Sequence, residues 1–454
     1  MSHSVSSVIY LTQPSEARLQ GSLRVPGDKS ISHRSIMLGA LAEGVTHITG
    51  FLEGEDSLNT LRCFRAMGVS ITDPVAGVVH VEGVGLHGLK APEKPLYVGN
   101  SGTSMRLMAG ILAGQSFDTV LEGDASLSRR PMKRVIDPLT QMGAVIEAAE
   151  GGRSPLTIRG SQRLKAINYA LPMASAQVKS CVLLAGLYAQ GRTCATEPAP
   201  TRDHTERMLS GFGYPVERQG ATACVTGGGS LQGRTIDVPA DISSAAFFMV
   251  AASIARQADI TLEHVGMNPT RTGVIDILKA MGADITVHNP RTVGGEPVAD
   301  IQVKSACLRG IDIPEHLVPL AIDEFPVLFV AAACAEGRTV LTGAEELRVK
   351  ESDRIAVMAD GLQKLGINAL ATSDGMVIEG RGTEDAIFGE AEIWSQGDHR
   401  IAMAFAVAGL RARGQIRIHD CQFVETSFPG FATLFRNCGG GLVDAQAESA
   451  GVAQ

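Results

Sequence analysis

Six apolar runs rich in Ala, Val and Leu recur along the chain, each behind a short polar segment and each ending at or near a glycine. The polar segments begin near residues 28, 100, 175, 241, 323 and 398. None of the runs shows the clean polar face that a helix at the protein surface would have. The pattern therefore predicts six helices that are buried on nearly all sides.

A second helix is predicted behind each of these runs, because each is followed by a further stop signal for a helix. The glycines at these stops are Gly68, Gly143, Gly213, Gly282, Gly366 and Gly439. A β-rich run such as 119–122 separates the two helices, and an alternating stretch that doubles back follows the second. With one strand before each first helix, the repeating unit is strand, helix, strand, helix, strand, strand.

The chain has 454 residues, more than the about 250–300 that a single hydrophobic core usually serves. The units are also longer than the roughly 20–50 residues of solenoid repeats. We therefore predict an α/β protein of two domains, each with three βαβαββ units around buried helices. Packed helices would direct several N-termini to one end of each domain, and a cleft between the domains would collect their dipoles, hydroxyls and cations.

The formal net charge is −8, and aromatic residues make up 4% of the chain. An acidic chain poor in aromatics lacks the basic surface and the stacking platforms of nucleic-acid-binding proteins. The predicted helices are also shorter than the about 20 apolar residues that cross a bilayer. We expect neither a nucleic acid nor a membrane as partner, and any anion site must be local.

The eight cysteines include no Cys-x-x-Cys pair, and several stand in apolar helices or strands. Buried thiols in a reducing compartment are the expectation, in preference to disulfides. Residues 1–20 hold no apolar core flanked by basic residues, which argues against a secretory signal. The eleven histidines show no metal-ligand spacing. We expect a cytoplasmic protein without a metal ion.

Cations stand at the starts of several predicted helices, although the chain is acidic overall. Lys29, Ser30 and Arg34 lie at or just before the start of the apolar run 35–41. Backbone N–H groups and the helix dipole already favour an anion at such a place. For this segment alone, a capped helix start with solvated charges is an equally good interpretation.

The same arrangement recurs elsewhere, and the repetition favours a functional interpretation. Lys350 and Arg354 are four residues apart and are predicted to share one face of a helix. Arg130 and Arg202 each stand close to the start of another predicted helix. Together the segments indicate a pocket for small, multiply charged anions.

Five segments resemble motifs of the 5-enolpyruvylshikimate-3-phosphate synthase family and occur in that family's order: 27–34, 99–103, 130–132, 348–354 and 398–403. Segments 172–180 and 201–206 further resemble the bacterial subclass of the family that includes glyphosate-tolerant enzymes. The resemblance covers nearly the whole chain.

The resemblance implies two three-unit domains, each an inside-out α/β barrel, around an interdomain cleft that holds the active site. It also implies that the chain crosses between the domains near Pro26 and near Pro239. Residues 1–26 plus 240–454 would then form domain I, and residues 27–239 domain II. A monomer is expected.

The reaction implied by the resemblance belongs to the shikimate pathway of aromatic amino acid biosynthesis. The enolpyruvyl (1-carboxyvinyl) group of phosphoenolpyruvate is transferred to the 5-hydroxyl of shikimate 3-phosphate by addition and elimination, and phosphate is released. Such a path needs an acid near the methylene carbon, a base near the hydroxyl, and donors around two phosphates and a carboxylate. The two substrates are the expected partners, and no organic cofactor or metal is implied.

The family's functional residues carry over to matching positions of this chain. Shikimate 3-phosphate is expected to contact Lys29, Ser30, Arg34, Ser175, Gln177, Arg202, Asp323 and Lys350. Phosphoenolpyruvate is expected to contact Lys29, Asn100, Gly102, Arg130, Gln177, Arg354 and Arg400. Asp323 is expected to be the base for the hydroxyl, and Glu351 the proton donor and acceptor at the methylene carbon. Lys29 could share either proton role.

The chain departs from the family's pattern at several positions. Ala176 stands where many members have a second hydroxyl, and the segment 426–429 lacks a lysine that many members carry there. His399 or Arg400 could compensate for that lysine. Gly102 stands where glyphosate-tolerant relatives carry alanine, whose methyl group would crowd the phosphoenolpyruvate pocket. We therefore expect glyphosate to inhibit this protein in competition with phosphoenolpyruvate.

Two alternatives remain at this point. The related enolpyruvyl transferase that acts on UDP-N-acetylglucosamine shares the fold, but its catalytic loop carries a cysteine, and the comparable segment 123–130 has none. A non-catalytic anion-binding scaffold built from the same repeat is the other alternative. It would use Asp323 and Glu351 only as helix caps.

Overall fold

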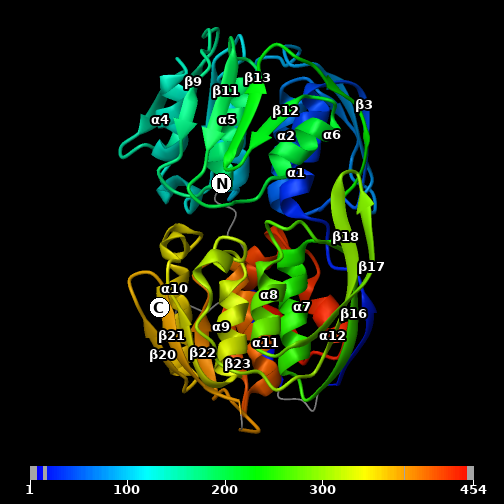
Figure 1. The fold of residues 1–454 in the computed structure, drawn as a ribbon, viewed down its shortest axis with the longest axis vertical. Coiled ribbons are helices and arrows are strands. Elements are labelled where there is room, and N and C mark those ends of the chain that lie inside the picture. Colours follow the sequence, from blue (N-terminus) through cyan, green and yellow to red (C-terminus); the bar gives the residue numbers. More distant parts are fainter. Residues whose placement is uncertain (1–7, 14–17, 383, 447–454) are drawn as a thin grey trace, which may run out of the picture. The chain divides into compact units, whose positions relative to one another are not determined.

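The computed structural model describes residues 8–13, 18–382 and 384–446, and the chain divides into two compact units. Unit 1 consists of Met1–Pro26, Ala240–Arg291 and Val298–Gln454, and unit 2 of Gly27–Pro239 and Thr292–Pro297. Both units mix helices and sheets, as Figure 1 shows. The predicted α/β class is confirmed.

In unit 2 the predicted apolar runs form α1 (Lys29–Leu41), α3 (Gly102–Leu112) and α5 (Ala176–Gly186). Helix α3 packs against both α1 and α5, and the three helices bury most of their residues. The second helices are α2 (Glu55–Ala66), α4 (Lys133–Gln141) and α6 (His204–Gly211), with a short 3-10 turn η1 (Leu127–Arg129) before α4.

The described strands of unit 2 form sheets that repeat one plan: a parallel pair followed by an antiparallel hairpin. One sheet contains β6 (Leu96–Tyr97), β7 (Thr119–Glu122), β9 (Arg153–Arg159) and β8 (Val145–Ala149), in that order. A second contains β10 (Asn168–Ala170), β11 (Arg192–Thr196), β13 (Thr222–Thr226) and β12 (Val216–Gln219). The third contains β14 (Leu231–Gln232), β3 (Ala42–Thr49), β5 (Val79–Val84) and β4 (Ser70–Ile71), with β15 (Thr235–Asp237) also on β3.

In unit 1 the apolar runs form α7 (Ile242–Ile254), α9 (Phe325–Ala333) and α11 (His399–Ala408), which pack against one another. The second helices are α8 (Gly273–Ala280), α10 (Arg354–Lys364) and α12 (Phe431–Asn437). Short 3-10 turns are η2 (Glu315–Leu317), η3 (Glu345–Val349), η4 (Gly409–Arg411) and η5 (Cys421–Thr426).

Among the described strands of unit 1, one sheet follows the same plan and two depart from it. In one of these two, β1 (Val8–Thr12) from the N-terminal end of the chain replaces one strand of the hairpin, and in the other the first strand is reduced to isolated bridges. One sheet runs β17 (Asp284–Val293), β18 (Glu296–Lys304), β16 (Gln257–Gly266) and β2 (Arg18–Leu23). Another runs β22 (Ala391–Trp394), β23 (Ile416–His419), β1 (Val8–Thr12) and β24 (Leu442–Gln446). The third contains β19 (Glu336–Leu341), β21 (Met376–Arg381) and β20 (Asn368–Ala371), where isolated bridges at Arg309 and Asp312 replace the first strand.

The strands that precede α1 and α7 do not pair within the repeat that follows them. β2 precedes α1 but lies parallel to β16 of unit 1, with Ser22 opposite Thr261. β15 precedes α7 but lies parallel to β3 of unit 2, with Ile236 opposite Ile48. The chain passes from one unit to the other after β2 and again after β15. Each of these strands therefore lies in one unit, whereas the helix that follows it lies in the other.

The predicted helix stops are confirmed by the backbone conformation. Every predicted stop glycine has a positive φ, between 84° and 108°, a region that glycine enters without a Cβ clash: Gly68, Gly143, Gly213, Gly282, Gly366 and Gly439. The second helices therefore end where the sequence indicates, and the chain turns back into a strand of its sheet.

Each unit has its own apolar core, built around the three buried helices. All residues of α7 are buried, as the lack of a polar face predicts. Removing a side chain as large as Phe248 from such a core would cost about 3–5 kcal/mol. The buried helices are thus the rigid supports on which polar residues at the helix starts are mounted.

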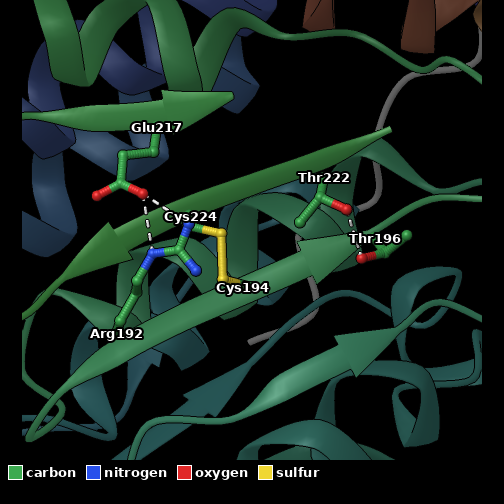
Figure 2. The surroundings of a disulfide bond; sticks show 6 residues. All are labelled: Arg192, Cys194, Thr196, Glu217, Thr222 and Cys224. Atoms are coloured by element: carbon green, nitrogen blue, oxygen red, sulfur yellow. Dashed lines mark hydrogen bonds and ion pairs between the residues drawn. A yellow bond between two sulfur atoms is a disulfide. The ribbon is translucent and has the colours of Figure 1, made fainter. Parts of the chain in front are cut away.

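The expectation of free thiols is wrong for one pair. Cys194 on β11 lies directly opposite Cys224 on β13, with 4.1 Å between the Cα atoms, and the two form a disulfide (Figure 2). Arg192 and Glu217 form an ion pair beside it. The strand register places the two cysteines together, and a sequence separation of 30 residues gives no sign of that. The other cysteines are free and buried, except Cys307, which is exposed.

We expect thiol titration of the denatured, unreduced protein to find the six free cysteines and not all eight. Replacing both Cys194 and Cys224 by serine should lower the free energy of unfolding by about 2–4 kcal/mol, because the link constrains the unfolded chain. Cys307→Ser is the control and should leave the stability unchanged. Titration of eight thiols would contradict the disulfide.

Candidate active site

The start of α1 holds Lys29 beside a carboxylate. Asp28 caps the helix, since its Oδ1 accepts the backbone N–H of Ile31 at 2.9 Å. Lys29 is then the first helical residue, and its Nζ lies 3.1 Å from Oδ2 of Asp56, in the first turn of α2. The sequence analysis missed Asp56, because an acidic residue at a helix start is also expected from the helix dipole alone.

Arg34 lies further along α1 and is buried. Its Nε donates to Oγ1 of Thr205 on α6 at 2.8 Å, and its Nη2 donates to Oγ of Ser180 on α5 at 2.9 Å. Its Nη1 donates to the carbonyl oxygen of Ser30 at 2.9 Å. The guanidinium therefore connects the starts of three helices of unit 2.

Burial is the main reason that the pKa of Arg34 falls to about 10. The carboxylates of Glu206 and Asp28 oppose this fall, and the nearby cation of Arg202 adds to it. At neutral pH Arg34 is still protonated, so two positive charges act on each other here. A bound anion would relieve that repulsion.

A second group of predicted residues gathers at the start of α3. Nη2 of Arg130 donates to Oδ1 of Asn100 at 2.5 Å, and Nδ2 of Asn100 donates to Oδ2 of Asp124 at 2.7 Å. Gly102 is the first residue of α3, and a Cβ there would lie 3.3 Å from Nη1 of Arg130 and 2.9 Å from Nη1 of Arg106. The missing side chain leaves these guanidinium groups uncrowded.

The start of α5 connects with this group. Ser175 caps α5 by accepting the backbone N–H of Val178 at 3.4 Å. Gln177 on the first turn donates to Oγ1 of Thr103 at 3.0 Å, and its Oε1 accepts from Arg106 of α3. The predicted residues of α3 and α5 are therefore held together within unit 2.

In unit 1 the predicted residues surround Arg354. Its Nε donates to Oδ2 of Asp398 at 2.8 Å, its Nη1 to Oδ1 of Asp323 at 3.2 Å, and its Nη2 to Oε2 of Glu351 at 2.6 Å. The side chain is 1% exposed. Burial lowers the pKa of Arg354, but the carboxylates of Asp398, Glu351 and Asp323 together raise it above its usual value. The guanidinium is permanently charged and holds both predicted proton-transfer carboxylates.

Lys350 and Arg400 complete this cluster. Nζ of Lys350 lies 3.4 Å from Oδ1 of Asp323, and Nη1 of Arg400 donates to the backbone oxygen of Asp323 at 3.3 Å. The prediction that Lys350 and Arg354 share one face of a helix is wrong. Lys350 is extended and ends η3, whereas α10 begins at Arg354 behind the cap residue Asp353. The two cations meet through Asp323 instead.

The structure thus assembles the predicted site residues in two sets, one in each unit. Unit 2 holds Lys29, Ser30, Arg34, Asn100, Gly102, Arg130, Ser175, Gln177 and Arg202, and unit 1 holds Asp323, Lys350, Glu351, Arg354 and Arg400. Asp398 was missed, although it adjoins Arg400 in the segment 398–403 that carries the resemblance. The same carboxylate also caps α11, because its Oδ1 accepts the backbone N–H of Arg400 at 3.0 Å.

The residues that the structure describes are 8–13, 18–382 and 384–446. Among them, no group of three or more His, Cys, Asp or Glu side chains is placed to hold a metal ion. None of their helices combines the length and the apolarity needed to cross a membrane.

Comparison with known proteins identifies the family. The profile described as EPSP synthase (3-phosphoshikimate 1-carboxyvinyltransferase) matches residues 14–434. A 3-phosphoshikimate 1-carboxyvinyltransferase of Alkalilimnicola ehrlichii is 70% identical over 95% of this chain and 96% of its own length. One of Nitrosococcus oceani is 65% identical over 97% of each chain. The chain belongs to the EPSP synthase family.

A solved EPSP synthase of Acinetobacter baumannii is 60% identical, with a TM-score of 0.87 over 97% of this chain and 100% of that one. As a member of the EPSP synthase family, the chain is a transferase of the shikimate pathway. It transfers the enolpyruvyl group of phosphoenolpyruvate to shikimate 3-phosphate. The predicted activity is confirmed, and 3-phosphoshikimate is favoured over UDP-N-acetylglucosamine as acceptor.

The structure predicts a large structural effect for Asp398→Asn. The change leaves the buried Arg354 one carboxylate short, and removing one partner of a buried ion pair typically costs about 3–5 kcal/mol. Denaturant unfolding followed by circular dichroism measures the loss. Asp360→Asn is the control: it breaks an exposed ion pair with Lys364 on the same α10. That pair should contribute about 0–1 kcal/mol. Equal stability of the two variants would contradict this view of the cluster.

Proposed function

We propose that Asp323 and Glu351 divide the proton transfers of an addition–elimination reaction. Asp323 removes the proton of the 5-hydroxyl as that oxygen attacks phosphoenolpyruvate. Glu351 delivers a proton to the methylene carbon and takes one back when phosphate leaves, and Lys29 assists. The observation that carries this proposal is the shared guanidinium of Arg354, which binds both carboxylates. One rigid cation thereby sets the direction in which each carboxylate can act.

We propose that shikimate 3-phosphate binds Lys29, Ser30, Arg34, Ser175, Gln177 and Arg202 of unit 2, together with Asp323 and Lys350 of unit 1. The repulsion between Arg34 and Arg202 supports this assignment, because a dianionic phosphate would neutralise two cations at once. The buried position of Arg34 strengthens the attraction, since water screens it less.

We propose that phosphoenolpyruvate binds Lys29, Asn100, Gly102, Arg130, Gln177, Arg354 and Arg400. Its phosphate and carboxylate together need several cationic donors, which these residues supply. Arg400 is nine-tenths buried and takes the place of the lysine that the segment 426–429 lacks in assisting phosphate departure. His399, which is also buried, is the alternative for that role.

We also propose that the two units correspond to the predicted domains, 1–26 with 240–454 and 27–239. The two units differ from these bounds only in Thr292–Pro297, which belongs to unit 2. A monomer and a cytoplasmic location stay predictions.

The proton role of Asp323 is tested by Asp323→Asn, which keeps an oxygen for Arg354 but cannot accept a proton. We expect phosphate release from the two substrates to slow by about 10²–10⁴-fold, the usual contribution of a general base. Glu346→Gln is the matched control, because Glu346 also pairs with Lys350, at 3.9 Å, and has no assigned role. A rate within twofold of the unaltered protein for Asp323→Asn would refute the assignment. A parallel assay with UDP-N-acetylglucosamine should release no phosphate.

Segments 172–180 and 201–206 support the proposal that the chain falls in the subclass that includes glyphosate-tolerant enzymes. Gly102 nevertheless predicts sensitivity, with glyphosate competing against phosphoenolpyruvate. Gly102→Ala should raise the inhibition constant by about tenfold or more, because its Cβ would press on Arg106 and Arg130. Gly389→Ala is the control, since its new Cβ would lie 3.4 Å from the nearest atom, the backbone oxygen of Leu365, which is an ordinary contact. Inhibition that does not weaken at high phosphoenolpyruvate would reject competition.

A further inference from the structure

Lys179 is a buried lysine that has no assigned role in the reaction. It lies on α5, two residues after Gln177, and is 1% exposed. Its Nζ is 2.8 Å from Oε1 of Glu206 on α6 and 3.1 Å from both carboxylate oxygens of Glu197, which follows β11. Burying an ammonium group is costly unless it is paired, and these two carboxylates provide the pairing.

Through Glu197, Lys179 fixes the segment that leads to Arg202. Oε1 of Glu197 accepts the backbone N–H of Thr201 at 3.2 Å, and Oε2 accepts from Oγ1 of Thr201 at 2.5 Å. The loop between β11 and Arg202 is therefore closed by one carboxylate. Because that carboxylate is bound to Lys179, the loop is also attached to α5, and Thr201 is the residue directly before Arg202.

Through Glu206, the same lysine fixes the first turn of α6, where Thr205 binds Arg34. Oγ1 of Thr205 accepts from Nε of Arg34 and donates to Oγ of Ser180 at 2.7 Å. Ser180 is the neighbour of Lys179 on α5 and also accepts from Arg34. Two hydroxyls whose positions depend on α5 and α6 thus orient the Arg34 guanidinium.

Lys179 also restrains a competing anion. Glu206 is the nearby carboxylate that acts most strongly on Arg34. Without the ammonium of Lys179, Glu206 would be free to turn toward the two arginines and neutralise the charge that a phosphorylated substrate needs. The pairing therefore keeps Glu206 out of the binding site as well as fixing the loop.

We propose that Lys179 is a positioning residue for shikimate 3-phosphate: by binding Glu197 and Glu206 at once, it holds Arg202 and Arg34 in the orientation that grips the phosphorylated acceptor. This inference rests on the proposed assignment of Arg34 and Arg202 to that substrate. Lys179 touches no substrate and acts through the two arginines.

The test measures phosphate release at varied concentrations of each substrate. Lys179→Met, which keeps the length of the side chain and removes its charge, should raise the KM for shikimate 3-phosphate by about 10- to 100-fold, the effect of misplaced binding groups. The KM for phosphoenolpyruvate should change by less than about threefold. Lys133→Met is the control, because it removes an exposed lysine of unit 2 that pairs with Asp137. Equal changes in both KM values, or none, would overturn the inference.

Thr201→Val covers the case in which Lys179→Met does not fold. It removes only the hydroxyl that binds Glu197, and it should raise the KM for shikimate 3-phosphate selectively. An unchanged KM in a folded Thr201→Val protein would overturn the role of the loop.

Arg202→Gln separates this inference from the function on which it rests. If Arg202→Gln leaves the KM for shikimate 3-phosphate unchanged, the assignment of Arg202 itself is wrong. If it raises that KM and Lys179→Met does not, only the inference on Lys179 fails. If both single variants raise the KM for shikimate 3-phosphate, the double variant should raise it by less than the two fold-changes multiplied together, because Lys179 acts partly through Arg202.

Discussion

A helix buried end to end leaves the N–H groups of its first turn without helical acceptors, and this constraint shapes the structure. Five of the six buried helices that the structure describes meet it with side-chain caps, Asp28, Ser101, Ser175, Asp241 and Asp398, and α9 has a proline in its first turn instead. The positive ends of these helices also favour anions. Polar and charged residues therefore concentrate at these helix starts, and most of the proposed site residues stand at the same places.

The two units differ in how the charges at these helix starts are balanced. Around Arg354, three carboxylates face the cations of the cluster, so charge is largely neutralised within unit 1. In unit 2 Arg34 and Arg202 act on each other with the same sign. A fixed cation sets the orientation of the carboxylates proposed to transfer protons, whereas neighbouring cations suit a phosphate. The proposed division of roles follows from this difference.

Buried charges away from the substrates support the residues that are proposed to touch them. Asp398 holds Arg354 and caps α11, and Lys179 binds two carboxylates on separate segments. An isolated buried charge would be strongly unfavourable, but each of these groups makes several charge-assisted contacts. Rigid support of this kind is what a site for two small anions needs, because donors displaced by an ångström bind and catalyse poorly.

The sequence by itself determined the repeat, the buried helices, their stops at glycine and most residues of the proposed site. The first three depend on local chemistry: hydrophobic pattern, capping, and the positive φ that glycine adopts at positions such as Gly68 and Gly439. The site residues came from the family resemblance. Only the tertiary structure decided which strands β2 and β15 pair with, the Cys194–Cys224 disulfide and the partners of Arg354 and Lys179. Each of these joins residues far apart in the chain, and which ones meet depends on how strands register and helices pack.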